Sequence, residues 1–366
     1  MKIVVFGLTI TSSWGNGHAT LWRGLLRALR NSGCQLVFYE RDVPYYAATR
    51  DLIELAGVKL VLYEDWNSIR ATAKRDVFDC DAAIVTSYCA DALVASELVA
   101  ETSSAISVFY DLDTPVTLSR LSGGQEVSYI GPRGLRDYHL VLSFTGGEAL
   151  QQLRECLGAR QVAPLYGHVD PEVHRPSEGR PYYAADLSYL GTYSRDRQIA
   201  LRAFFIAAAQ QRPERRFLIG GAQYPSDFPW HPNIYFVHHT PPAQHATFFS
   251  SSRLTLNVTR EPMRRLGWCP SGRLFEAAAC GTPVISDCWQ GLDSFYTDGS
   301  EILIARSTED VIAALELGDG EVRAIGQAAR ARTLATHTST HRAAELLALL
   351  EGARHPAAVE PVMEGA

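Results

Sequence analysis

Strand-like runs and helix-like segments alternate along nearly the whole chain, in two separate series. Segments such as Ala19–Arg30, with apolar residues at helical spacing, separate the runs. The predicted strands are Ile3–Phe6, Leu36–Tyr39, Leu60–Tyr63, Ala82–Thr86, Ile106–Tyr110 and His139–Phe144, then Leu187–Leu190, Phe217–Ile219, Ile234–Val237, Leu254–Val258, Pro283–Ser286 and Ile302–Ile304. Such repeats are typical of parallel sheets with helices on both faces. The sequence therefore predicts an α/β protein with two doubly wound parallel sheets.

A stretch rich in Pro, Gly and charged residues separates the two series. The chain has 366 residues, which exceeds the length that one hydrophobic core usually serves. We therefore expect two Rossmann-like domains, at 1–168 and 186–335, joined by a linker at 169–185. Three helical patterns end the chain, at Glu309–Leu317, Gly320–Ala335 and Thr340–Leu350. The last predicts a C-terminal helix at 336–352, before a tail at 353–366 that we expect to be disordered.

Composition narrows the possible partners. The 40 acidic and 34 basic residues are mixed along the chain and give a net charge of −6, so no basic surface for nucleic acid is expected. No run approaches the roughly 18 apolar residues of a membrane span. The start MKIVVFGL resembles a first strand rather than a signal peptide, and the 7 cysteines form no CxxC pair. These features favour a cytoplasmic protein with reduced thiols.

The segment CPSGRLFEAAACGTPVIS has the pattern of an anion-binding helix start. Ser271 is a good N-cap, and Gly272 leaves backbone N–H groups open to a phosphate, to which Arg273 could add a contact. Glu276 lies one turn further on the same face, where a carboxylate can accept hydrogen bonds from vicinal ribose hydroxyls. The alternative is a surface helix with an Arg–Glu pair.

The second domain offers two more strand ends suited to a nucleotide. In YLGTYSRDRQ, Gly191 and Thr192 follow a strand, and Arg195 and Arg197 open a helix and could neutralise a diphosphate. One of the two Arg is expected to be solvated instead, with Asp196 as its partner. In FLIGGAQYP, Gly221 permits close approach of a ligand to the backbone. We expect these strand ends to converge on one nucleotide.

The first domain carries candidate catalytic residues. His18 follows a loop containing Gly15 and Gly17 and could act as a base or donor toward a substrate; alternatively it packs on Trp22. Asp111 and Asp113 follow the strand ISVFYD at the same sheet edge, and Asp113 could instead be an N-cap. His139, His168, His238 and His239 show no metal-binding spacing, so no structural or catalytic metal is predicted.

Five segments together resemble one known family. They are SSWGNGHAT, YDLDTPVTL, YLGTYSRDRQ, LTLNVTR and PSGRLFEAAACGTPVISDCWQGLD. They look like segments of the GT-B glycosyltransferases, most closely the CgeB-like (spore maturation protein-like) branch, over Lys2 to about Leu350. The resemblance implies two Rossmann-like domains facing across a cleft, a donor bound mainly in the C-terminal domain, a last helix packing back toward the N-terminal domain, and metal-independent catalysis.

The resemblance also implies roles for single residues. Glu276 would hold the donor ribose, the turn Ser271–Arg273 and the Arg195/Arg197 turn would hold the diphosphate, and His18 would face acceptor and donor sugar. The implied activity is hexosyltransferase-type transfer from a UDP-, GDP- or dTDP-linked sugar as co-substrate, with no other cofactor, to an acceptor that the sequence does not name.

One position departs from the family pattern. Many retaining relatives carry a second Glu eight residues before the ribose Glu, and here that position is Trp268. Retention and inversion both stay open. An inverting enzyme needs a base, for which Asp111, Asp113 and His18 are candidates, whereas in a retaining enzyme they position the acceptor.

Two other functions fit parts of the pattern. Gly15, Gly17 and Glu40 imitate the dinucleotide fingerprint of an NAD(P)-dependent oxidoreductase, although Thr20 replaces the third glycine. A non-catalytic nucleotide-sugar-binding protein would share the same C-terminal motifs.

Overall fold

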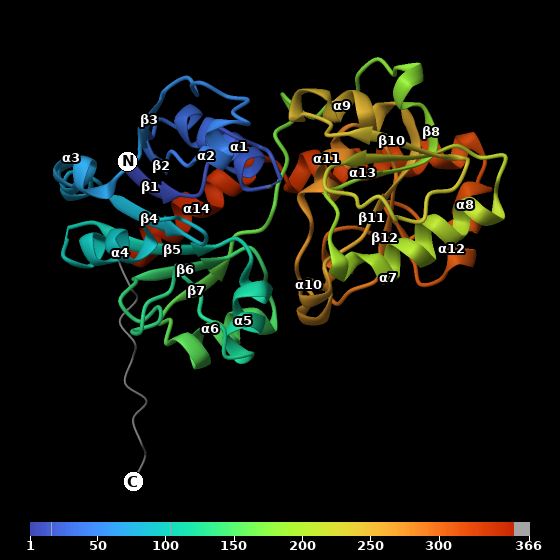
Figure 1. Cartoon of the computed structure of the whole chain (residues 1–366). Helices are drawn as coiled ribbons and strands as arrows, with labels where there is room; N and C mark the ends of the chain where they lie inside the picture. The colour runs from blue at the N-terminus through green and yellow to red at the C-terminus, as the bar shows by residue number, and fades with distance from the viewer. Residues whose placement is uncertain (16, 103, 355–366) are drawn as a thin grey trace, which may run out of the picture.

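The first sheet has seven parallel strands. The computed structural model describes residues 1–15, 17–102 and 104–354 and shows two lobes (Figure 1). The strands of the N-terminal lobe are β1 (Lys2–Gly7), β2 (Gln35–Arg41), β3 (Val58–Tyr63), β4 (Ala82–Thr86), β5 (Ile106–Asp111), β6 (Leu140–Ser143) and β7 (Val162–Pro164). Their order in the sheet is β3-β2-β1-β4-β5-β6-β7. Only β7, three residues long, lacks a counterpart among the strands predicted from the sequence.

The second sheet has six strands and is also parallel. They are β8 (Ala185–Leu190), β9 (Phe217–Gly221), β10 (Ile234–His238), β11 (Ser252–Asn257), β12 (Val284–Asp287) and β13 (Leu303–Ala305), in the order β10-β9-β8-β11-β12-β13. In both sheets the order reverses beside the first strand of the series, β1 or β8, which is the doubly wound arrangement. The predicted α/β class with two Rossmann-like sheets is confirmed.

Helices connect the strands. In the N-terminal lobe they are α1 (His18–Asn31), α2 (Pro44–Ala47), α3 (Trp66–Phe78), α4 (Ala92–Ala100), α5 (Thr114–Ser122) and α6 (Glu148–Leu157). After them come α7 (Gln198–Leu201), α8 (Ala207–Gln211), α9 (Pro242–Ser250), α10 (Glu261–Leu266), α11 (Gly272–Ala279), α12 (Thr308–Leu315), α13 (Asp319–Thr336) and α14 (Ser339–Arg354). Single turns lie at Pro181–Tyr183, Arg195–Arg197 and Leu292–Ser294, and a π-helical turn at Arg202–Ile206 joins α7 to α8.

Both faces of each sheet are buried. In β1, Val4 and Phe6 belong to one apolar cluster, while Ile3 and Val5 belong to the cluster on the other face. Successive side chains of a strand point to opposite faces, so a continuous apolar run is what a sheet covered by helices on both sides requires. This burial explains why the strands contain so many Val, Ile, Leu and Phe residues.

The chain passes between the lobes twice, and the two passages run side by side. Val169 forms a parallel bridge with Thr338, and Ser339 N donates to Val169 O at 2.8 Å. Beyond this bridge α14 lies in the N-terminal lobe, where Leu346 and Leu350 join the cluster that contains α1 (Figure 1). Burying two Leu side chains stabilises this position by roughly 1.5 to 3 kcal/mol each.

The described residues contain no helix that combines the length and apolarity needed to cross a membrane. The prediction of a tail at 353–366 begins two residues too early, because Ala353 and Arg354 are the last residues of α14. From residue 355 onward the predicted tail lies outside the described residues.

Candidate active site

A cavity of about 720 Å³ lies at the carboxyl ends of the strands of both sheets. Parallel α/β sheets bind ligands at this edge. Among the lining residues are His18 and Asp113 from the first lobe, and Gly191, Thr192, Arg197, Gly221, Ser271, Gly272, Arg273 and Glu276 from the second. The structure thus brings ten of the twelve candidate residues to one cavity. Asp111 and Arg195 do not line it.

The first turn of α11 faces the cavity. Ser271 has an extended backbone at the N-cap position and makes no capping hydrogen bond with its side chain, so the helix start is not closed by its own cap. A Cβ on Gly272 would have Glu276 Oε1 as its nearest neighbour, at 3.8 Å. The space in front of Gly272 is therefore open toward the cavity, as an anion-binding helix start requires.

Arg273 and Arg197 meet at this helix start with hydrogen-bonding capacity left over. Arg273 Nη1 and Arg197 Nε are buried and have no partner among the described residues. Burial and the charge of Arg197 lower the pKa of Arg273. Two neighbouring guanidinium groups with unpaired N–H donors are unfavourable without an anion, because each carries a desolvated charge. The site is complementary to a diphosphate.

One of the two predicted Arg is solvated, as expected, but Asp196 is not its partner. Arg195 is exposed on the surface. Asp196 does not pair with either predicted Arg; its Oδ2 accepts from Arg260 Nε at 2.9 Å, and its other oxygen accepts from the Ser194 hydroxyl. Arg260 also lines the cavity and extends its basic surface, although the sequence patterns did not single it out.

Gly221 is required by the packing of the strand ends against Gly191. A Cβ on Gly221 would lie 2.1 Å from the Gly191 carbonyl oxygen, which no rearrangement of a side chain could relieve. The same carbonyl accepts from Tyr224 Oη at 3.0 Å. Both glycines line the cavity, so at this point the cavity wall consists of backbone atoms.

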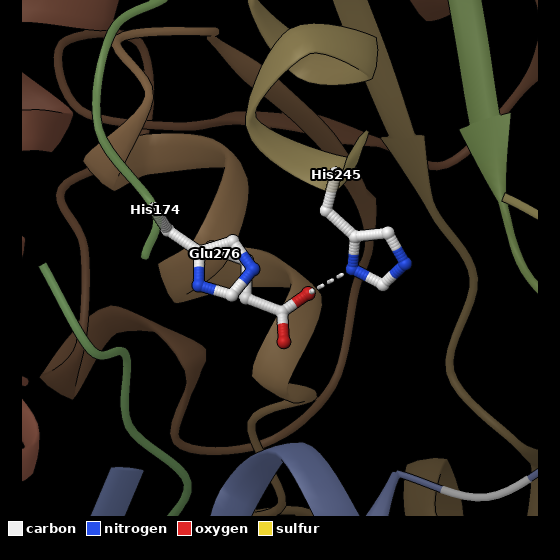
Figure 2. A group of neighbouring side chains, drawn as sticks. All are labelled: His174, His245 and Glu276. Atoms are coloured by element: carbon white, nitrogen blue, oxygen red, sulfur yellow. Dashed lines mark ion pairs between the residues drawn. The ribbon is translucent and has the colours of Figure 1, made fainter. Parts of the chain in front are cut away.

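Two histidines accompany Glu276 that the sequence patterns did not identify. His245 on α9 has Nδ1 3.8 Å from Glu276 Oε2, and His174 of the linker lies in the same group (Figure 2). Burial lowers the pKa of each histidine to about 4, so both rings are neutral at pH 7. The metal-ligating atoms of the three residues lie within 4.8 Å of one another, and a metal ion could be held there. No sequence spacing signals this group, because its members come from three distant segments.

On the first lobe, His18 and Asp113 form a pair. His18 Nε2 lies 3.4 Å from Asp113 Oδ2, and the His18 ring contacts Tyr88 edge-on, with 5.7 Å between ring centroids. Trp22, the alternative partner expected for His18, makes ring contacts with Phe38 and Tyr110. Asp113 occupies the N-cap position of α5, yet its side chain makes no capping hydrogen bond. Its carboxylate is therefore available to the cavity.

Asp111 holds the backbone of Asp113 in place. It is fully buried, and its Oδ1 accepts from Asp113 N at 3.0 Å, which fixes the turn after β5. Burial raises the pKa of Asp111 to about 6. Since it does not reach the cavity, its position is that of a supporting residue rather than one that touches substrate.

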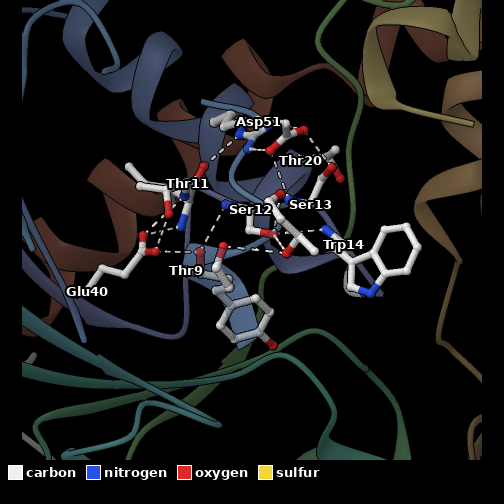
Figure 3. A network of polar contacts seen from close by, with 12 residues as sticks. Thr9, Thr11, Ser12, Ser13, Trp14, Thr20, Glu40 and Asp51 are labelled. Atoms are coloured by element: carbon white, nitrogen blue, oxygen red, sulfur yellow. Dashed lines mark hydrogen bonds and ion pairs between the residues drawn. The ribbon is translucent and has the colours of Figure 1, made fainter. Parts of the chain in front are cut away.

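Glu40 is not available to a dinucleotide. Its carboxylate accepts four hydrogen bonds from the loop after β1, contributed by the Thr9 hydroxyl, the Thr11 hydroxyl and the N–H groups of Ile10 and Thr11, at 2.5 to 3.1 Å (Figure 3). Glu40 is 1% exposed. A carboxylate saturated in this way has no acceptor capacity left for ribose, which argues against the oxidoreductase alternative.

Trp268, at the position of the second Glu in many relatives, lies outside the cavity lining. Its ring covers Gly147 of the first lobe and Gly291 of the second: a Cβ on either glycine would approach the indole to 2.4 Å. Trp268 O also accepts from Gly146 N at 3.0 Å. The residue joins the two lobes.

Comparisons with known proteins agree with this geometry. Residues 197–348 match the family model described as glycosyl transferase-like, whereas no curated protein matches the chain. A solved sucrose-phosphate synthase from Thermosynechococcus elongatus superposes with a TM-score of 0.72 at 15% identity, over 96% of this chain and 98% of its own. HepE from Anabaena, solved with UDP and glucose, gives 0.68 at 13% identity, over 96% and 99%.

A third solved structure, an alpha-glucosyltransferase in complex with UDP-glucose and DNA containing an abasic site, has a TM-score of 0.68 at 11% identity, over 96% of this chain and 99% of its own. At such identities the likeness establishes the fold. The chain has the GT-B fold, and the family match within its C-terminal half supports a glycosyltransferase.

Proposed function

We propose that the protein transfers a sugar from a nucleoside-diphosphate donor to an acceptor hydroxyl, without a metal ion in the reaction, and that it belongs to the CgeB-like branch of GT-B enzymes. The observation that carries the proposal is the pair Arg197 and Arg273 beside the open start of α11: Arg197 Nε and Arg273 Nη1 are buried and have no hydrogen-bond partner among the described residues. Two guanidinium groups supply the charge that a metal supplies to diphosphates elsewhere.

The donor would lie along the second lobe. Its diphosphate would contact Arg197, Arg273 and the turn at Gly272, and its ribose hydroxyls would donate to Glu276, one turn further along α11. The names of the similar structures include UDP and UDP-glucose, which makes a UDP-sugar the first donor to test.

In the reaction the bond between the sugar C1 and the β-phosphate oxygen breaks, and a bond from the acceptor oxygen to C1 forms. The leaving diphosphate gains negative charge, which Arg197 and Arg273 would stabilise. The acceptor proton would pass to a group on the first lobe, where Asp113 with its partner His18 is placed to receive it.

The acceptor class is open to experiment. One similar structure was solved with DNA, but the net charge of −6 on this chain disfavours a polyanionic acceptor. We therefore infer a small-molecule or glycan acceptor.

Calorimetric titration with UDP, GDP and dTDP, with EDTA present, tests the donor site. We expect one nucleoside diphosphate to bind with micromolar affinity and to bind at least tenfold more weakly to Arg273→Ala. Binding of NAD in place of every nucleoside diphosphate would overturn the proposal. Slow hydrolysis of the nucleotide sugar to the nucleoside diphosphate in the absence of acceptor would show that the protein is an enzyme rather than a non-catalytic binder.

A further inference from the structure

Three potential metal ligands meet where the donor ribose is expected. His174 comes from the linker, His245 from α9 and Glu276 from α11, and their ligand atoms lie within 4.8 Å of one another (Figure 2). All three residues line the cavity. Their chemistry matters because each presents a lone pair to the same small volume.

A hydrogen bond from the His245 ring to the backbone determines which ring nitrogen carries the lone pair that faces Glu276. Nε2 lies 3.1 Å from the carbonyl oxygen of Thr240, which can only accept, so Nε2 carries the hydrogen. In the neutral ring Nδ1 is then an acceptor, and it faces Glu276 Oε2 at 3.8 Å. Metal-binding histidines are typically held by such an outer hydrogen bond to a carbonyl.

His174 adds a third acceptor with no protein partner. The residue is 4% exposed, and neither ring nitrogen has a hydrogen-bond partner within the described part of the chain. Leaving such a group unsatisfied costs free energy of the order of 1 to 3 kcal/mol. An acceptor on His174, one on His245 and the Glu276 carboxylate could therefore all be satisfied by one shared positive partner.

The two vicinal hydroxyls of a ribose satisfy this group only in part, because they have two hydrogens to donate and Glu276 alone can accept both. A cation bound between the three residues would use all three lone pairs at once. Two imidazoles and one carboxylate form a donor set typical of Zn²⁺ sites with an open fourth position, whereas Mg²⁺ and Ca²⁺ prefer oxygen ligands. Ligand atoms of a tetrahedral Zn²⁺ site lie about 3.4 Å apart, so small side-chain rotations would close the group.

We propose that His174, His245 and Glu276 bind a Zn²⁺-type transition-metal ion, and that this ion and the ribose of the donor compete for Glu276. The competition rests on the proposed function, whereas the metal site itself does not. The ion would lie outside the chemical step and inhibit it. By linkage, bound Zn²⁺ lowers nucleotide affinity by the same factor by which the nucleotide lowers Zn²⁺ affinity.

The test is a calorimetric titration of metal-free full-length protein with Zn²⁺ alone. Exposed Cys156 and Cys288 could bind Zn²⁺ independently, so both are replaced by Ser in every sample. We expect one equivalent of Zn²⁺ to bind, and the affinity to fall at least tenfold in His174→Phe, which keeps the ring volume and removes both nitrogens. His238→Ala, at an exposed histidine outside the cavity lining, is the matched control and should bind normally.

A second variant controls for misfolding, and a spectrum tests which ligands hold the metal. His245→Ala should lose the same site, and both variants should melt at the wild-type temperature in EDTA; if one is unfolded, the other decides. Co²⁺ should give the visible bands of nitrogen and oxygen ligation without an intense thiolate band. Zn²⁺ binding that is absent, or equal in the folded histidine variant and in wild type, overturns the site.

Competition is measured by repeating the nucleoside diphosphate titration with Zn²⁺ present. Because the diphosphate also chelates Zn²⁺ in solution, His174→Phe provides the correction: it keeps chelation and loses the site. If Zn²⁺ weakens the apparent nucleotide affinity of the wild type but not that of His174→Phe, the competition is supported. If Zn²⁺ weakens both affinities equally, the competition is rejected. If Zn²⁺ binds as expected but no nucleotide binds in EDTA, the proposed function fails while the metal site stands.

Discussion

His18 Nε2 lies 3.4 Å from Asp113 Oδ2, although the two residues follow different strands, β1 and β5. The doubly wound topology brings the ends of these strands to one edge of the sheet. The other ring nitrogen of His18, Nδ1, is buried and has no hydrogen-bond partner among the described residues, and the side chain of His18 is 12% exposed against 19% for that of Asp113. Asp113 is thus better placed than His18 to contact an acceptor.

Replacing Asp113 should slow the chemistry and leave donor binding unchanged. Asp113→Asn removes the proton acceptor but keeps the size of the side chain, and we expect kcat to fall by about 10²- to 10⁴-fold. The dissociation constant of the nucleoside diphosphate should stay within about twofold, since that ligand binds the other lobe. Asp137→Asn, on the surface, is the control. An equal loss of nucleotide affinity would assign Asp113 to the donor site instead.

Arg273 and Arg195 should differ although both were predicted to hold the diphosphate. Arg273 lines the cavity with a buried, unpaired Nη1, whereas Arg195 is exposed. Losing a charge-assisted contact costs about 1.5 to 3 kcal/mol, so Arg273→Ala should weaken nucleoside diphosphate binding by about 10- to 150-fold. Arg195→Ala should change it by less than about threefold. Calorimetry in EDTA measures both, and a reversed order would move the diphosphate away from α11.

The fold could be predicted from the sequence because its strands are buried on both faces. Continuous apolar runs marked twelve of the strands, including Pro283–Ser286, which the structure places at Val284–Asp287. The strand Val162–Pro164 was missed because three residues carry no periodicity. Gly281, with φ of +79°, ends α11 after Cys280, in line with the sequence pattern.

The site could be predicted only where it follows a strand end or a helix start in sequence. The strand-end rule located Gly191 and Arg197, and the helix-start pattern located Glu276. Neither signal reveals the direction of a side chain. Asp111 precedes Asp113 by two residues and points into the protein, because the residue still belongs to β5. His174 and His245 reach Glu276 through tertiary packing alone, and Glu40 is turned inward by the loop that it holds.

Two glycines of the cavity wall should respond differently to an added methyl group. In Gly221→Ala the new Cβ would meet the Gly191 carbonyl at 2.1 Å, so we expect a loss of about 1 to 3 kcal/mol in unfolding free energy. In Gly272→Ala the nearest atom is 3.8 Å away, and the melting temperature should not fall. The methyl group would instead enter the space expected for phosphate and weaken nucleotide binding. Differential scanning calorimetry compares the two, and equal melting temperatures would contradict the packing argument.

Asp111 should make the stability of the protein depend on pH. Its pKa is about 6 in the folded protein because of burial, above its value in the unfolded chain. The folded state therefore holds the proton more tightly, so stability falls as pH rises toward 6 and is lowest once Asp111 is ionised. Between pH 5 and 7.5 the loss from this group is about 1.4 kcal/mol.

Asp111→Asn isolates this effect. Asn keeps an oxygen for the Asp113 N–H and does not titrate, so the free energy of unfolding of the wild type minus that of the variant should fall by about 1.4 kcal/mol from pH 5 to 7.5. All other groups cancel in this difference. Urea unfolding at both pH values, followed through the transition of the N-terminal lobe, measures it. A constant difference would mean that Asp111 is ionised throughout this range, and that water or an unpaired charge is accommodated beneath Asp113.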